Sequence, residues 1–201
     1  MLSKTELKIL ARLGDDWAKE YTIREISIVL QQPYPQTHRA ISSLLHHNLI
    51  TKKTRGKSSI IQLILEEKHD EYLWAEIERK KEILKRYKVI QLIAHDLEKI
   101  RTGQFICILF GSYAAKKAGA DSDIDLLFVI PDEYDYGRFE QEVKTTITLS
   151  KADINITSEK GLLEMWKNPL KLNVGNEILK KHFILYGAEP FLRLRRKYCV
   201  G

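Results

Sequence analysis

Two aspartates separated by one residue, Asp123 and Asp125, stand at the start of the apolar run DIDLLFVI. Because side chains alternate between the faces of a strand, both carboxylates should project to one side while Ile124 enters the core. Two bare carboxylates so close repel each other, so the pair is stable chiefly when a divalent cation neutralises it. Oxygen ligands with open positions suit Mg²⁺ or Mn²⁺ completed by substrate phosphates. The pair therefore predicts phosphate chemistry.

A Gly-Ser pair, Gly111 and Ser112, precedes these aspartates by ten residues. It falls where the strand QFICILF should end and a short helix begin, so backbone N–H groups there would face a phosphate. The missing Cβ of Gly111 would let the phosphate approach, and Ser112 would cap the helix and donate to a phosphate oxygen. Just after them, Tyr113 either stacks on a base or packs in the core. Lys116 and Lys117 either serve the triphosphate or are ordinary surface lysines.

A third carboxylate, Asp153, lies in the segment KADINIT. Alternation there places Ile154 and Ile156 on one face and Asp153 on the polar face with Asn155 and Thr157. A strand, a helix and a second strand over 123–157 would bring Asp153 beside the first pair. A two-metal mechanism needs such a third acid.

The elements that must position these residues alternate between strand and helix over residues 103–201, which predicts an α/β domain with a mixed sheet. We expect strands at QFICILF, DIDLLFVI and ADINIT, and helices at YGRFEQEVKTTITLS, SEKGLLEMWKN and GNEILKKHF. The segment ILYGAEPF should be extended, with Gly187 in a turn. The tail FLRLRRKYCV should be a solvated basic end, with nucleic-acid or nucleotide contact as its alternative.

Residues 1–65 predict a separate α+β domain of three helices and a hairpin. Ser3 and Glu6, and again Thr22 and Glu25, form capping boxes ahead of apolar stripes. Two prolines at 33 and 35 argue against helix through 31–35, so the third helix should follow at QTHRAISSLLHHNLI. Two short strands about the turn TRGK complete the unit.

Residues 66–102, rich in Glu and Lys three and four apart, predict one long helix or two helices ending before Gly103. The apolar stripe expected there comprises Leu73, Ile77, Leu84, Ile90, Ile93 and Leu97. We interpret this segment as a linker between the domains, with a homodimer interface as the alternative.

The chain of 201 residues carries a net charge of +6, and most of the excess is N-terminal. Residues 26–65 contain no Asp or Glu, which favours a basic surface facing a polyanion, although solvated lysines would give the same bias. The sequence has no signal-peptide-like start and no run long enough to span a bilayer, so we expect a cytoplasmic protein without membrane contact. Cys107 should be a core residue, and it and Cys199 suggest neither a disulfide framework nor a zinc site.

The motif Gly111-Ser112, YAAKKAGADS, Asp123-Ile124-Asp125 resembles the signature of minimal nucleotidyltransferases of the DNA polymerase β superfamily. That resemblance implies that Asp123, Asp125 and Asp153 bind metal ions while Gly111 and Ser112 hold the triphosphate of an NTP such as ATP. Many relatives follow the serine with an aromatic or small residue and then Ala, Arg and Gly. Here Tyr113, Ala114 and Ala115 precede Lys116 and Lys117, so that arginine and glycine are absent.

Residues 1–65 resemble the winged helix-turn-helix domains of transcription regulators. The resemblance implies that the third helix enters the DNA major groove and that the hairpin, or wing, touches phosphate. The residues so assigned are Gln36, Thr37, His38, Arg39, Ser42 and Ser43 on the helix, and Lys52, Lys53, Arg55 and Lys57 on the wing. The same fold also serves as a protein-docking or dimerisation module.

The sequence thus predicts a Mg²⁺-dependent nucleotidyltransferase that moves an NMP from an NTP to a hydroxyl of a protein or nucleic acid and binds DNA. One alternative is a DNA-binding regulator whose second domain only senses nucleotide. Another is an antitoxin-type modifier of a partner protein.

Overall fold

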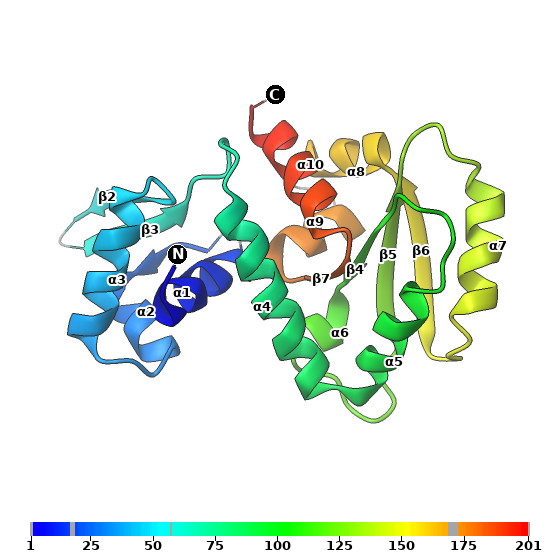
Figure 1. Cartoon of the computed structure of the whole chain (residues 1–201), viewed down its shortest axis with the longest axis horizontal. Coiled ribbons are helices and arrows are strands. Elements are labelled where there is room, and N and C mark those ends of the chain that lie inside the picture. The colour runs from blue at the N-terminus through cyan, green and yellow to red at the C-terminus, as the bar shows by residue number, and fades with distance from the viewer. Residues whose placement is uncertain (1, 17–18, 57, 169–172, 201) are drawn as a thin grey trace.

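The computed structural model describes residues 2–16, 19–56, 58–168 and 173–200. Figure 1 shows a group of helices beside a small sheet at one end of the chain, and a four-stranded sheet with its helices at the other. The long helix α4 (Asp70–Arg86) lies between the two groups. The mixed α/β fold expected for residues 103–201 is present.

Helices α1 (Lys4–Gly14) and α2 (Ile23–Val29) begin at the predicted capping boxes. In α1 the Ser3 hydroxyl accepts from the Glu6 N–H while the Glu6 carboxylate accepts from the Ser3 N–H, and Thr22 and Glu25 repeat the arrangement in α2. These caps satisfy backbone donors that a helix start leaves without a partner.

Helix α3 (Tyr34–His46) begins earlier than the prolines led us to expect. Pro33 is its N-cap residue and Pro35 lies in its first turn. The prediction of no helix through 31–35 is wrong at this point, because a first-turn residue needs no intrahelical N–H bond and proline's fixed φ already suits a helix.

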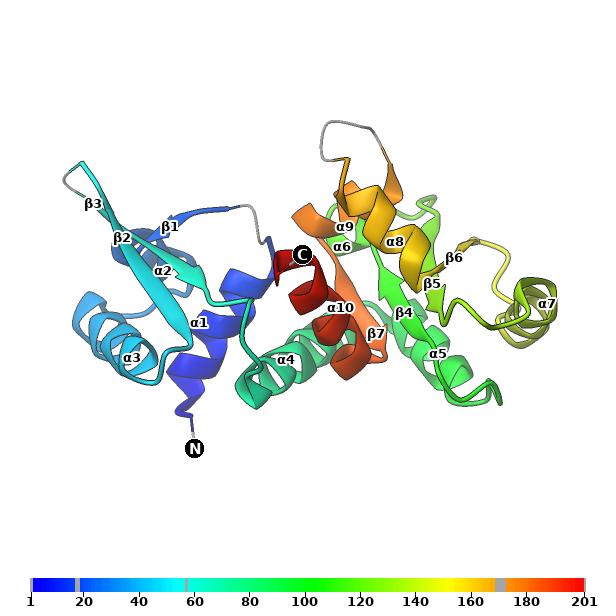
Figure 2. The ribbon, with the colours of Figure 1, turned by 90° about the horizontal axis from the view of Figure 1, so that it is seen from above.

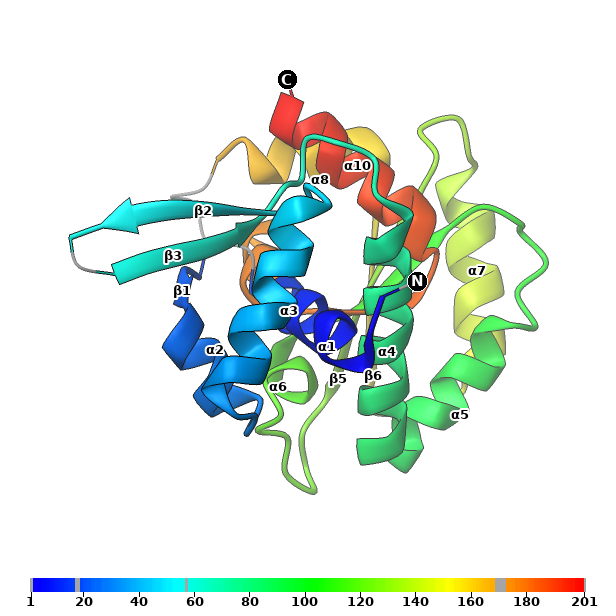
Figure 3. The same cartoon turned by 60° about the vertical axis from the view of Figure 1, so that its left-hand side comes forward.

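Strands β1 (Tyr21–Thr22), β2 (Ile50–Arg55) and β3 (Ser58–Leu63) form an antiparallel sheet in the order β1-β3-β2. Strands β2 and β3 are the predicted hairpin, which extends outward from the helices (Figure 3). Gly56 takes the left-handed conformation at its tip, with φ of +61°. Together with α1, α2 and α3 this sheet makes what we call the N-terminal unit, with Ile9, Ile26, Ile41, Leu44 and Ile61 in its core.

Two helices, α4 and α5 (Lys88–Leu97), follow, separated by the extended residue Tyr87. The predicted apolar stripe is correct for α5, where Ile90, Ile93 and Leu97 are buried. For α4 it is wrong. The residues buried there are Tyr72, Ala75, Glu76, Arg79 and Ile83, while Leu73, Ile77 and Leu84 are half-buried.

The buried face of α4 therefore contains an ion pair. Arg79, only 1% exposed, donates to Glu76 Oε1 at 2.5 Å and to Asp15 Oδ1 at 3.2 Å. It also donates to the carbonyl oxygen of His182. Since Asp15 caps α1 and His182 directly precedes strand β7 (Phe183–Tyr186), this one guanidinium joins the N-terminal unit to the second sheet.

The second sheet has the strand order β6-β5-β4-β7, from β4 (Ile106–Leu109), β5 (Ile124–Ile130), β6 (Ala152–Ser158) and β7. Strands β5 and β6 are parallel, whereas β4 is antiparallel to both β5 and β7. Helix α7 (Tyr136–Thr146) supplies the crossover that parallel neighbours require. The sheet is therefore mixed, as predicted.

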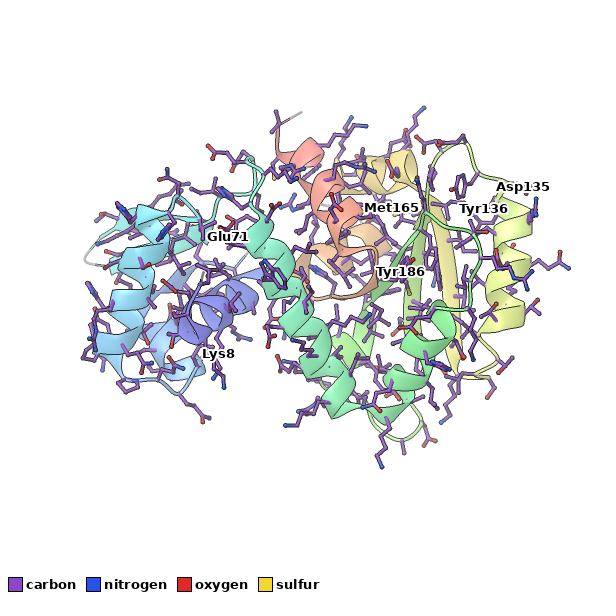
Figure 4. All side chains as sticks on the ribbon, viewed as in Figure 1. Lys8, Glu71, Asp135, Tyr136, Met165 and Tyr186 are labelled. Atoms are coloured by element: carbon purple, nitrogen blue, oxygen red, sulfur yellow. The ribbon has the colours of Figure 1, made fainter. Side chains whose placement is uncertain are left out.

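Both faces of this sheet are covered. On one, Cys107, Leu126 and Phe128 pack with buried residues of α5 and α7. On the other, Ile108 and Leu127 pack with α8 (Glu159–Trp166), α9 (Val174–Lys180) and α10 (Ala188–Val200), as the view from above shows (Figure 2). Charged side chains such as Lys8 and Asp135 point outward (Figure 4).

The basic tail is not the solvated end that we predicted. It is helix α10, which follows strand β7 and the left-handed turn residue Gly187, with φ of +76°. Phe191 and Leu194 are buried, so the helix is held by its apolar face while basic residues occupy the rest. In the part of the chain that the structure describes, every helix is too short or too polar to span a bilayer.

Candidate active site

Asp125 and Asp153 lie directly opposite each other on strands β5 and β6. The parallel register pairs Ile124 with Ala152, Asp125 with Asp153 and Leu126 with Ile154. Because alternate residues share a face, both carboxylates lie on the side that α8 and α9 cover further along the strands. The predicted adjacency of these two acids is confirmed, and it comes from the sheet register.

The Gly111-Ser112 turn packs against Asp125. Gly111 follows β4 and begins the short helix α6 (Gly111–Ala114), and the Phe110 N–H donates to the Asp125 carbonyl at 3.0 Å. Gly111 has φ of +66°, and a Cβ built on it would stand 1.9 Å from Asp125 Oδ2. Glycine is therefore required by its conformation and by the aspartate, in addition to any phosphate.

Ser112 contributes differently from the prediction. The N-cap residue of α6 is Phe110 and no side chain caps this helix, so the expected capping role of Ser112 is wrong. Its backbone N–H instead donates to the Asp125 carboxylate. The turn thus orients the aspartate directly.

The pKa of Asp125 is raised above its ordinary value. Burial is the main cause and the charge of Asp153 the second, while the hydrogen bond from Ser112 lowers the pKa and the charges of Asp123 and Glu177 raise it. Asp123, Asp153 and Glu177 are all exposed. Glu177 is the acid that sequence reasoning missed, because only the packing of α9 brings it near β5.

Helix α9 is anchored against α8. The Trp166 indole Nε1–H donates to the Gly175 carbonyl at 3.0 Å, and a Cβ on Gly175 would lie 2.6 Å from the Cβ of Met165, which Figure 4 labels. No signal near Glu177 in the sequence marks this contact.

No three His, Cys, Asp or Glu side chains among the described residues form a ready-made metal cluster. Asp125 and Asp153 are nevertheless register partners on neighbouring strands, and their repulsion helps to raise the Asp125 pKa. A divalent cation would relieve that repulsion, and carboxylate oxygens are the ligands that Mg²⁺ and Mn²⁺ prefer. The pair therefore fits such an ion by its donor chemistry.

Residues 81–189, more than half of the chain, match the protein family described as "Polymerase beta, Nucleotidyltransferase". The chain belongs to this nucleotidyltransferase family. Its match begins in α4 and includes the Gly-Ser turn, both strands with aspartates and β7.

One solved structure, described as "Crystal structure of the toxin-antitoxin with AMP-PNP", is similar at 18% identity and a TM-score of 0.36, covering 55% of this chain and 83% of that one. At so low a TM-score the similarity says nothing about the function of this nucleotidyltransferase-fold chain. No curated protein matches the chain.

The three residues after Ser112 that were candidates for nucleotide contact occupy different surroundings. Tyr113 is 8% exposed and its ring packs against that of Tyr87 with centroids 4.9 Å apart, which makes it a core residue. Lys116 Nζ lies 2.5 Å from Glu82 Oε1 on α4, and Lys117 is exposed. Of the two lysines, Lys116 is thus engaged by α4 and Lys117 is the more exposed.

Most residues predicted to contact DNA are on the surface. His38, Arg39 and Ser42 are exposed on α3, and Ser43 is half-buried there; Lys52, Lys53 and Arg55 are exposed on β2. Arg55 forms an ion pair with Glu20 at 2.6 Å. Gln36 donates to the Thr5 hydroxyl at 3.1 Å.

Thr37 is a correction to that set. It is 0% exposed and its hydroxyl donates to the Pro33 carbonyl at 3.3 Å, because it lies on the core side of α3 one helical turn before Ile41. Lys57 lies outside the described residues.

Proposed function

We propose that this chain is a nucleotidyltransferase that moves a nucleoside monophosphate from an NTP, such as ATP, to a hydroxyl group of a protein or nucleic acid. The observation that carries the proposal is the Asp125–Asp153 rung with the Gly111-Ser112 turn packed against it. Membership in the nucleotidyltransferase family supports it.

In this proposal Asp125 and Asp153, with Asp123 two residues before the first, would hold Mg²⁺ or Mn²⁺. The ion would neutralise the triphosphate and stabilise the charge that develops on the leaving pyrophosphate. The residues of the chain orient the donor. Ser112, whose N–H already donates to Asp125, would offer its hydroxyl to a phosphate oxygen, and Lys117 would add a positive charge.

The test is incubation of the purified chain with each labelled NTP and Mg²⁺ or Mn²⁺. Release of pyrophosphate, or label on a protein or nucleic acid, is the expected result, with both lost in Asp153→Asn. If no NTP reacts and Asp125→Asn binds NTP as tightly as the parent, the proposal fails. Where label is transferred, mass spectrometry of the labelled partners would identify the acceptor.

We further propose that the N-terminal unit is a winged helix-turn-helix that binds DNA. Its support is the exposure of His38, Arg39 and Ser42 on α3 and of Lys52 and Lys53 on β2, in a stretch without acids. Neutralisation of phosphates by such cations predicts affinity that falls steeply as salt rises. Salt-independent binding, or equal affinity in Arg39→Ala, would argue for a protein-docking role.

Activity and DNA binding are separable. A chain that binds NTP and DNA but releases no pyrophosphate would be a regulator that senses nucleotide, the second candidate function. The observation that favours this second candidate is the absence of Asp and Glu from residues 26–65.

A further inference from the structure

A polar cavity of about 260 Å³ lies where the β2–β3 hairpin meets α10. We call it the junction cavity. Its polar lining comes from three distant parts of the chain, namely Lys19, the strand residues Thr51, Lys53 and Gln62 with Glu66 just beyond them, and Arg195. Figure 2 shows the C-terminal end of α10 lying toward the N-terminal unit.

The junction cavity is a built feature of the fold. Leu192 of α10 packs against the core of the N-terminal unit, which holds this helix beside the hairpin. The Arg195 guanidinium lies over the Tyr198 ring at 5.0 Å, and Lys19 Nζ lies over the Tyr21 ring at 4.8 Å. Aromatic contacts thus position two of the three cations.

The charge of the cavity favours an anion. Lys19, Lys53 and Arg195 contribute three positive charges against one negative charge from Glu66. Burial lowers the pKa of Arg195, while the charges of Cys199, Tyr198 and Glu66 oppose that shift, and a bound anion would stabilise the cation further. Thr51 and Gln62 add neutral hydrogen-bond donors.

The expected anion is a phosphodiester. None of the described lining residues is aromatic, so the cavity offers no platform on which a base could stack. Two of its lining residues, Thr51 and Lys53, lie on β2, the strand whose exposed cations we propose to lie on a nucleic-acid backbone.

We propose that the junction cavity binds a backbone phosphate of nucleic acid, so that a nucleic acid held by the hairpin also contacts α10. This inference rests on the proposed DNA binding and deepens it, because it brings a helix of the C-terminal, transferase part of the chain into the complex. Nucleic acid bound in the junction cavity would then contact a helix that packs on the sheet carrying Asp125.

The experiment measures binding of a short fluorescent DNA duplex to the full chain by anisotropy over a range of salt. Glu66→Gln removes the acid of the cavity and should tighten binding about threefold to tenfold. Its matched control is Glu67→Gln, an exposed neighbour that does not line the cavity. Lys19→Gln should weaken binding by a similar factor and reduce the salt slope by about one, whereas Lys68→Gln should change neither.

The outcomes separate the two proposals. If the duplex binds but Glu66→Gln and Lys19→Gln match their controls, the junction cavity is not a phosphate site and DNA binding stands without it. If no duplex binds, the proposed DNA binding itself fails. Titration with inorganic phosphate and with ATP forms the second arm. If Glu66→Gln raises the affinity for inorganic phosphate or ATP but leaves the duplex affinity unchanged, the cavity binds free phosphate compounds. That result would overturn the proposal that the bound phosphate belongs to nucleic acid.

Discussion

Asp125 and Asp153 are register partners on neighbouring parallel strands, although they are 28 positions apart in the chain. Burial is the main cause that raises the Asp125 pKa, and the repulsion between the two carboxylates adds to it. Without a bound cation, the same pair of carboxylates that could bind one therefore destabilises the folded protein.

Asp125→Asn should abolish transfer and stabilise the protein without metal. The loss of a cation ligand should cost several kcal/mol of transition-state stabilisation, about a thousandfold in rate. Because the folded pKa is raised, the carboxylate opposes folding at neutral pH, and the amide removes that charge while its oxygen still accepts from Ser112. Calorimetry should show a higher Tm for Asp125→Asn than for the parent. The control is Glu140→Gln on the distant helix α7, whose Tm should not rise. A lower Tm for Asp125→Asn would contradict the electrostatic reading.

Gly111→Ala should damage both the turn and the aspartate beside it. The left-handed φ and a Cβ only 1.9 Å from Asp125 Oδ2 each oppose the change, at about 1–3 kcal/mol together. Denaturant unfolding would measure this cost, and NTP turnover should fall as Asp125 is displaced. Gly119→Ala is the matched control, since nothing lies within 4 Å of its position. Equal effects at the two glycines would refute the role of the turn.

Arg79→Met should destabilise the chain by about 3–5 kcal/mol, because it leaves the carboxylate of Glu76 buried without its cation. Arg79 also joins Asp15 to the His182 carbonyl, so the N-terminal unit and the sheet should unfold in separate transitions in this variant. The double variant Arg79→Met/Glu76→Met should recover part of the loss, and Lys81→Met on the exposed face should change little. Circular dichroism with urea would follow both transitions. A single unshifted transition in Arg79→Met would exclude the joining role.

His182 should make stability depend on pH. Burial, and then the charge of Arg79, lowers its pKa well below the ordinary value, while Nδ1 lies 2.7 Å from the Ile178 carbonyl oxygen. The unfolded chain takes up a proton below about pH 6.5, whereas the folded chain does not. The stability contributed by neutral His182 is therefore complete above that pH and is lost as pH falls.

Unfolding free energies of the parent and His182→Gln at about pH 7.5 and 5.5 would measure this contribution. The parent should lose more stability than the variant on acidification, and exposed His38→Gln should follow the parent. A parent and a His182→Gln variant with parallel pH profiles would show that the imidazole does not resist protonation.

Local rules were enough for several features. The capping boxes at Ser3 and Thr22 need only residues three apart, and the alternation of Asp123, Ile124 and Asp125 follows from strand geometry. The same rules gave wrong predictions for α3, where Pro35 is tolerated in the first turn. They also failed for the tail, where Phe191 and Leu194 pack against the sheet. Propensity cannot reveal a surface on which a helix will pack.

The sequence by itself determined the donor motif, its two aspartates and the strands and helices around them, because each depends on neighbours a few residues away. Only the tertiary structure decided that Asp153 lies opposite Asp125, that Glu177 adds a fourth charge, and that Arg79 joins the two parts of the chain. Those relationships depend on sheet register and helix packing over long separations. Register and packing are set by burial of the whole core, which no short stretch encodes.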